Sequence, residues 1–338
     1  MKKQSALRRV LRIRGMGPAI TAFIGLFVIF IAFGLINTKV FAFENIMNLL
    51  RSMSKYLLVG IGQSYVLITG NIDLSISSVV GMSAMISASL MCKGMSPLPA
   101  ILITIACSLV IGIINGILVG KFRLPPFIAT LGTMFVARGI AYMVYGNRNT
   151  DAISTGLGKE TADKLSYFFY YGSTLKVYNT FLISLVLFAA FFFLLSKTRT
   201  GRHIYAIGSN MEAAQLSGVN VEITITKAYL VSSFCSCVVG LILCAQSGMG
   251  NMEAGVMYEM YGVAAGVIGG ISPLGGTGIL LGTLAGSAVW QTLENGLSMI
   301  SAQVGIQRVV IGVIVVFAVL LDIVIRRGRG VKRVRPEK

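Results

Sequence analysis

The chain has 338 residues, of which 55% are hydrophobic and only 12% are charged, and its mean hydropathy is +0.81. These values exclude a soluble globular protein of this size and predict a polytopic membrane protein with a single transmembrane domain over residues 1–338. The net charge of +17 does not indicate nucleic-acid binding, because the basic residues gather at the two ends and in short loops between apolar segments.

Taken in chain order, the apolar segments predict an all-α fold with about ten transmembrane or re-entrant helices. Roughly twenty apolar residues make one crossing. Eight segments qualify, and these are residues 16–36, 74–92, 98–120, 125–145, 179–196, 226–246, 277–297 and 306–325. Two shorter runs, 56–70 and 257–271, end in polar breaks that contain glycine and either cross or re-enter. Glycines four residues apart, such as Gly112 and Gly116, predict close packing between helices.

Charge predicts the orientation of these helices. With the N-terminus inside, ten crossings place four segments in the cytoplasm, namely the tail 1–15, the short loop 121–124, the loop 197–227 and the tail 326–338. These segments hold 19 of the 29 Lys and Arg residues. Because cytoplasmic loops carry the excess of positive charge, both termini are predicted to be cytoplasmic.

The segments expected at the outer side are residues 37–55 and 146–178. The first mixes polar and apolar residues and predicts a helix that lies on the outer membrane surface. The second is an external loop with four basic and three acidic residues. Its aromatic run, 167–171, is typical of an anchor at the membrane interface.

The chain offers no convergent set of catalytic groups. It has one histidine, His203, and its 12 acidic residues lie mostly at ends and in loops. The five cysteines have no paired or metal-type spacing. There is no G-x-x-x-x-G-K-[ST] phosphate loop. We therefore expect a protein that is not an enzyme, with no catalytic residue, metal or cofactor of its own.

Ionisable residues at membrane depth are candidates for a solute path, because each costs about 3 kcal/mol to place there. Asp73 either caps the helix that begins beside it or lines a path at the break. Arg138 and Glu294 fall at similar depth and either pair with each other or line the path. The path candidates, including polar residues and glycines of the same segments, are Asn71, Asp73, Ser75, Phe127, Thr130, Arg138, Glu259, Gly269, Gly270, Glu294 and Asn295.

Residues 197–227 are a polar interruption between apolar segments. Asn210 is expected to cap a short helix over residues 212–216, and Gly218 to end it in a left-handed turn. An ordinary solvated loop gives no reason for its apolar residues, which are Ile204, Tyr205, Ile207, Leu216 and Val219. We therefore predict that a partner docks on this loop.

Four segments carry a further signal, and these are residues 69–75 (TGNIDLS), 124–134 (LPPFIATLGTM), 200–221 and 267–276 (VIGGISPLGG). In sequence and in order they resemble the permease subunits of ATP-binding-cassette importers for ribose, galactose, xylose and related monosaccharides. The resemblance covers nearly the whole chain. It implies a second permease copy, identical or paralogous, in the cytoplasmic membrane of a bacterium. It also implies an ATPase subunit at the cytoplasmic face, which binds the ATP, and an extracytoplasmic sugar-binding protein.

The resemblance also implies roles for the loop 197–227. The spacing E-A-A-x-x-x-G looks like the importer loop that fits into a cleft on the ATPase. The residues expected to couple the two subunits are Gly201, Arg202, Tyr205, Gly208, Asn210, Glu212, Ala213, Ala214, Leu216 and Gly218. The chain departs from the family pattern beside the presumed path, at Asn71, Tyr261 and Pro273.

Other functions remain open from the sequence. Related permeases carry autoinducer-like sugars, nucleosides or branched-chain amino acids. A function of another class is that of a stand-alone secondary carrier, which would need no ATPase dock. The few buried carboxylates argue against the carrier and favour a neutral cargo.

Overall fold

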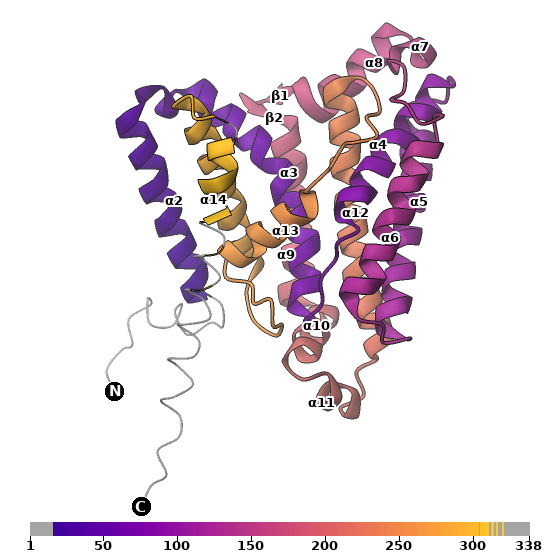
Figure 1. Ribbon diagram of the computed structural model, residues 1–338, viewed down its shortest axis with the longest axis vertical. Helices are drawn as coiled ribbons and strands as arrows, with labels where there is room; N and C mark the ends of the chain where they lie inside the picture. Colours follow the sequence, from indigo (N-terminus) through magenta and orange to yellow (C-terminus); the bar gives the residue numbers. More distant parts are fainter. Residues whose placement is uncertain (1–15, 304, 311, 314–315, 317–319, 321–338) are drawn as a thin grey trace, which may run out of the picture.

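The computed structural model describes residues 16–303, 305–310, 312–313, 316 and 320 of the 338. The predicted tails, 1–15 and 326–338, lie outside the described residues, as does much of the predicted span 306–325. The described chain is a helical bundle with one short two-stranded hairpin (Figure 1). The all-α class predicted from the sequence is therefore confirmed.

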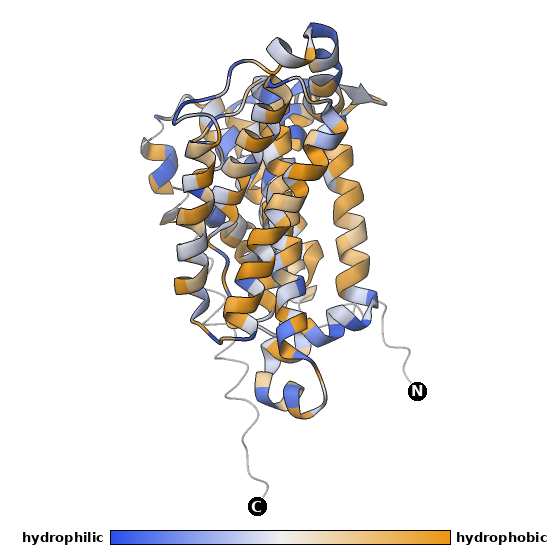
Figure 2. Cartoon of the chain, turned by 90° about the vertical axis from the view of Figure 1, so that its right-hand side faces the viewer, coloured by the Kyte–Doolittle hydropathy of each residue, from blue (hydrophilic) through white to orange (hydrophobic). Residues whose placement is uncertain are grey.

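Long apolar helices form the frame of the bundle. Five helices of the described part are long and apolar enough to cross a membrane, and these are α2 (Met16–Ile36), α5 (Pro97–Gly120), α6 (Pro126–Met143), α9 (Asn179–Lys197) and α12 (Val221–Ser247). Each lies within a few residues of a predicted span. A shorter apolar helix, α4 (Ile76–Cys92), follows the first predicted break. The long helices stand side by side in Figure 1, and their apolar residues form a band between two more polar ends in Figure 2.

The helix α3 corrects two sequence predictions. It is continuous over Phe43–Ile68, with the short 3-10 turn η1 (Thr38–Phe41) before it, so there is no separate surface helix over 37–55 and no isolated run over 56–70. The polar residues of its first half differ in exposure. Glu44 and Asn48 are exposed, whereas Asn45 is buried and Arg51 lies 4.1 and 4.7 Å from the centres of two tyrosine rings in the loop predicted to be external.

Two breaks interrupt the helical bundle, as predicted. Residues 69–75 leave the helical path between α3 and α4, and Gly70 has a φ of +82°. The helix α13 (Tyr258–Ile268) has only eleven residues, and α14 (Leu280–Met299) begins after a second irregular segment. Both breaks therefore follow a helix that ends at a glycine-containing turn.

The core is built around α12, which packs against α3, α4 and α5. The approach of α5 is close enough that a Cβ added to Gly116 would lie 2.5 Å from Thr226 Cα. Only glycine allows the two backbones to come this near. The glycine spacing in α5 thus has the packing role that the sequence predicts.

Short elements close the two ends of the bundle. One end carries α7 (Ser154–Leu157), α8 (Lys159–Ser166), the π-helical turn η2 (Tyr167–Tyr171) and the hairpin of β1 (Ser173–Thr174) and β2 (Val177–Tyr178). The opposite end carries α10 (Arg199–Ser209) and α11 (Met211–Leu216) (Figure 1). The loops predicted to be external and cytoplasmic therefore lie at opposite ends of the molecule.

Candidate functional site

Local capping forms the two helices of the loop between α9 and α12. The side chain of Thr198 accepts a hydrogen bond from the N–H of Gly201 at the start of α10. Asn210 accepts one from the N–H of Ala213, at 2.9 Å, and so begins α11. Gly218, with a φ of +83°, lies just beyond the end of α11. The predicted cap and the predicted left-handed turn are confirmed.

The helix α10 packs into the chain itself. Ile204 and Ile207 are buried, at 0% and 2% exposed. The hydroxyl of Tyr205 donates to the carbonyl of Gly278 at 2.8 Å, and burial raises its pKa to about 12, so it stays a donor at physiological pH. Contacts with other segments of the same chain thus account for the apolar residues of α10, and the docking of a partner on the loop stays a prediction.

The helix α11 has the opposite character. Leu216 is 90% exposed, and Glu212, Ala213 and Gln215 are exposed beside it. Ala214 is buried against the chain. The exposed face of α11 therefore centres on one large apolar side chain, that of Leu216.

A junction of four glycines joins α10 to both breaks. A Cβ added to Gly208 would lie 1.8 Å from the carbonyl oxygen of Ile68, at the end of α3, and 2.5 Å from the nitrogen of Gly276. A Cβ added to Gly275 would lie 2.8 Å from Gly208 O and 2.9 Å from Gly70 Cα. Backbone from α10, from the first break and from the second break therefore meets with no room for a side chain.

A hydrogen bond tethers the two ends of this junction. The N–H of Gly276 donates to the carbonyl of Ile68 at 2.9 Å. The two breaks are thus bonded to each other at the point where α10 lies on them. The sequence indicates each segment separately, but no spacing in it relates Gly208 to either break.

A second contact links α11 to the loop between α5 and α6. The guanidinium of Arg123 donates to the side-chain oxygen of Gln215 at 3.0 Å. A φ of +54° at Arg123 belongs to the sharp turn that aims it there. The sequence did not single out Arg123 as a site residue. The signal available for it was its position in the short loop 121–124, which is predicted to be cytoplasmic.

The first break is held by the carboxylate of Asp73, which is fully buried. One oxygen accepts from the N–H and the hydroxyl of Ser75, at 2.9 and 2.6 Å. The other accepts from the hydroxyl of Ser232 on α12, at 2.6 Å. Asp73 does not take the N-cap position predicted for it, because the N-cap of α4 is Ser75, and the carboxylate binds the N–H of that cap residue and not one of the first turn of α4.

Hydrogen bonds continue from this carboxylate across the bundle. The side chain of Asn115 on α5 donates to Ser75 Oγ at 2.9 Å and accepts from the hydroxyl of Thr133 on α6 at 2.6 Å. The network thus connects α12, the first break, α5 and α6. Sequence reasoning missed Asn115, Thr133 and Ser232, which were visible only as single polar residues within apolar spans.

Other path candidates near this break lie outside the network. The side chain of Asn71 donates to Thr69 Oγ1 at 2.8 Å. The hydroxyl of Thr130 donates to the Pro126 carbonyl, one turn back in α6. Phe127 is 57% exposed at the start of that helix.

Of the two alternatives for Arg138 and Glu294, the pair does not form. Arg138 donates to three backbone carbonyls, those of Ser77, Met252 and Ala254, at 2.6 to 3.1 Å. It thus holds the segment before α13 against α4. Glu294 accepts instead from the hydroxyl of a tyrosine on α3, at 2.7 Å.

The path candidates on α13 and α14 and in the second break lie in different contacts. Asn295 exchanges two hydrogen bonds with Asn45, at 2.9 and 3.1 Å, and so joins the end of α14 to the start of α3. One carboxylate oxygen of Glu259 is buried without a hydrogen-bond partner. Gly269 lies so close to α14 that an added Cβ would be 2.1 Å from a carbonyl oxygen, and Gly270 has a φ of +87°. The predicted path residues are therefore distributed over several places.

The family of the chain follows from comparison with known proteins. Residues 45–319 match the family described as the branched-chain amino acid transport system permease component. Because the match covers most of the chain, the chain belongs to this family of membrane permeases.

Individual relatives carry more specific names. The ribose import permease protein RbsC of Bacillus subtilis (strain 168) is 35% identical over 307 residues, which cover 91% of this chain and 92% of the relative. The D-allose transport system permease protein AlsC of Escherichia coli (strain K12) is 32% identical, with 87% of this chain and 88% of the relative covered. The galactose/methyl galactoside import permease protein MglC of the same strain is 33% identical, with 82% and 86% covered. No solved structure matches the chain.

Proposed function

We propose that the chain is the transmembrane subunit of an ATP-driven importer for a monosaccharide of the ribose, allose or galactose kind. Family membership and the names of three relatives support this cargo. The scarcity of charged side chains at membrane depth favours a neutral solute. The single observation that carries the mechanism is the glycine junction, where α10, the helix immediately before the proposed docking helix α11, touches both breaks.

The proposed coupling starts at α11. An ATPase subunit receives Leu216 and the exposed face around it. Movement of α11 passes to α10, and α10 bears on Ile68 and Gly276 at the two breaks. Closely packed backbone segments cannot move independently, because protein interiors are packed as densely as crystals of small organic molecules. A shift of α10 therefore displaces the ends of α3 and of the segment before α14 together.

The proposed assembly contains two permease copies, the ATPase subunits and an extracytoplasmic sugar-binding protein. The chain has about ten crossings or re-entrant segments, and both termini are cytoplasmic, in the cytoplasmic membrane of a bacterium. The excess of Lys and Arg in the assigned cytoplasmic segments supports this orientation. ATP is hydrolysed by the partner and not by this chain.

Reconstitution tests the proposed function. The permease, its ATPase and its binding protein are placed in liposomes, and uptake of radiolabelled ribose, allose and galactose is measured with ATP and with a non-hydrolysable analogue. We expect uptake of at least one sugar with ATP only. Uptake by the purified permease alone, driven by an ion gradient, would instead identify a secondary carrier.

A further inference from the structure

A polar pocket of about 420 Å³ opens at the end of the bundle where α12 finishes. Its lining comes from α3, α4, α12, η2 and the segment 249–258 that leads into α13. Ser247 and Asn251 are exposed at its rim. The pocket also reaches Ala84, eight residues before Cys92 at the end of α4, which is about 12 Å along that helix. It therefore runs from the end of the molecule into the bundle.

Side chains that line this pocket carry hydrogen-bond donors without partners. An ammonium group has three donors, but Lys55 makes one long hydrogen bond within the described chain, to the side-chain oxygen of Gln246 at 3.5 Å. The side-chain nitrogens of Gln246 and Asn251 and the hydroxyl of Tyr258 have no partner among the described residues. A solute that displaces water from this pocket must therefore supply hydrogen-bond acceptors.

The charge in the pocket is offset from nearby. Among the described residues that line the pocket, Lys55 is the one charged side chain. The carboxylate of Glu294 attracts Lys55 electrostatically and accepts from the hydroxyl of Tyr56, the next residue of α3, at 2.7 Å. A cation with an anion of the same protein close by attracts a second anion weakly. The lining therefore favours a neutral solute with several oxygen atoms.

The wall of the pocket is fixed in place. The guanidinium of Arg138 on α6 donates to the carbonyls of Met252 and Ala254, at 2.6 and 3.1 Å. The N–H of Met252 donates to the side-chain oxygen of Asn149 at 3.0 Å. These bonds hold the segment 249–258 as one wall. The pocket is thus preformed, and its volume lies in the range of small-molecule sites, about 300–1,000 Å³.

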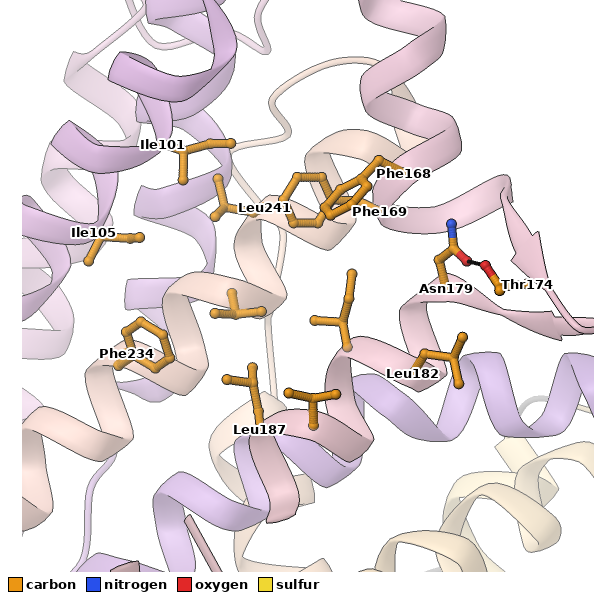
Figure 3. A pocket seen from close by; sticks show the side chains of 13 residues that line it. Ile101, Ile105, Phe168, Phe169, Thr174, Asn179, Leu182, Leu187, Phe234 and Leu241 are labelled. Atoms are coloured by element: carbon orange, nitrogen blue, oxygen red, sulfur yellow. Dashed lines mark hydrogen bonds between the residues drawn. The ribbon is translucent and has the colours of Figure 1, made fainter. Parts of the chain in front are cut away.

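A groove of about 640 Å³ beside α9 shows the contrast (Figure 3). Its lining is apolar except for Thr174 and Asn179, and the hydroxyl of Thr174 already donates to the side-chain oxygen of Asn179 at 2.9 Å (Figure 3). Burying a hydroxyl group without a hydrogen bond costs free energy. A polyhydroxylated solute is therefore expected in the polar pocket and not in this groove.

We propose that the polar pocket is an outer binding site for the transported sugar, occupied after the sugar leaves its binding protein. Lys55, Gln246 and Asn251 donate to hydroxyl oxygens of the sugar, each of which has two lone pairs. The aromatic rings of Tyr171 and Tyr258 supply the apolar surface that ligand sites combine with a few polar groups. The identity of the cargo and the outer position of the pocket rest on the proposed function.

Protection of a cysteine from labelling tests the site. The full-length permease with Ser247→Cys is placed in nanodiscs without ATP, ATPase subunit or binding protein. Its rate of reaction with a membrane-impermeant maleimide is measured while ribose, allose or galactose is titrated. We expect at least one sugar to slow the reaction at least fivefold. Lys159→Cys, on exposed α8, is the control and should react at an unchanged rate, and the chain with its five native cysteines supplies the background.

A second substitution in the Ser247→Cys chain tests the polar groups. Gln246→Ala should raise the half-protecting sugar concentration about fivefold, the effect of one lost hydrogen bond. Gln303→Ala is the matched control, because Gln303 is exposed and does not line the pocket. Asn251→Ala, at the exposed rim, should act like Gln246→Ala and serves as a second variant in case Gln246→Ala does not fold.

Three results would overturn the assignment. One is unchanged labelling at Ser247→Cys with all three sugars. Another is the wild-type half-protecting concentration in both Gln246→Ala and Asn251→Ala. The third is stronger protection by galacturonate than by galactose, which would identify an anion site.

These readouts separate the pocket from the proposed function, because they use neither ATP nor transport. ATP-driven uptake without protection would overturn the pocket alone. Protection by a sugar together with uptake driven by an ion gradient would overturn the importer and keep the pocket.

Discussion

Single residues without side chains let the loop 197–227 approach the helix breaks closely. Gly208 has a helical backbone, so no unusual φ explains it. Glycine is needed at this position because there is no room for a side chain, since an added Cβ would overlap Ile68 O and Gly276 N. The carboxylate of Asp73 stabilises the first break in a different way. Its hydrogen bonds satisfy a buried polar group, whose burial without partners would lower the stability of the fold by several kcal/mol.

Gly208→Ala tests the junction. Adding one methyl group to a closely packed site typically lowers the free energy of unfolding by about 1–3 kcal/mol. We expect a folded permease in which ATP hydrolysis by the complex no longer responds to the loaded binding protein, because α10 is displaced from the breaks. The measurements are ATPase activity and sugar uptake in liposomes.

The matched control is Gly25→Ala. Gly25 is also helical, in α2, and an added Cβ meets nothing within 4 Å. It should transport like the wild type. Normal coupling in Gly208→Ala would refute a role of the junction.

At the scale of elements, the two helices of the loop, α10 and α11, differ in how they pack. The helix α10 buries its apolar residues in the chain, whereas α11 exposes Leu216. The sequence pattern is the same for both, a few apolar residues within a polar segment. Only the packing distinguishes the helix whose apolar side chains are buried in the chain from the helix whose leucine is exposed.

Leu216→Asp tests the docking surface. A charge at the centre of an interface costs about 2 kcal/mol or more, which is roughly thirtyfold in affinity. We expect the permease to reach the membrane but to lose its ATPase in co-purification.

Leu175→Asp controls for the loss of an exposed leucine as such. Leu175 is 93% exposed at the opposite end of the molecule. It should retain the ATPase fully. Undiminished co-purification with Leu216→Asp would contradict docking at α11.

At the scale of the whole molecule, an apolar band separates two polar ends (Figure 2). One end carries α7, α8 and the hairpin, and the other end carries α10 and α11 (Figure 1). Such an arrangement fits a bilayer with the two loops on opposite sides.

Cysteine labelling tests the orientation. Whole cells expressing Ser154→Cys should react with a membrane-impermeant maleimide, because Ser154 lies in the predicted external loop. Gln215→Cys should react only after the cells are opened. The chain with its five native cysteines supplies the background. The reverse pattern would invert the proposed orientation.

The sequence by itself determined the class of the protein, the main spans and the ends of α11. Long apolar runs are stable only in a bilayer or a large core, and the cap at Asn210 and the turn at Gly218 depend on neighbours within a few residues. The tertiary structure alone decided that α3 is continuous, that Arg138 binds carbonyls and not Glu294, and that Gly208 meets both breaks. Each of these depends on contacts between segments far apart in the chain, which local patterns do not encode.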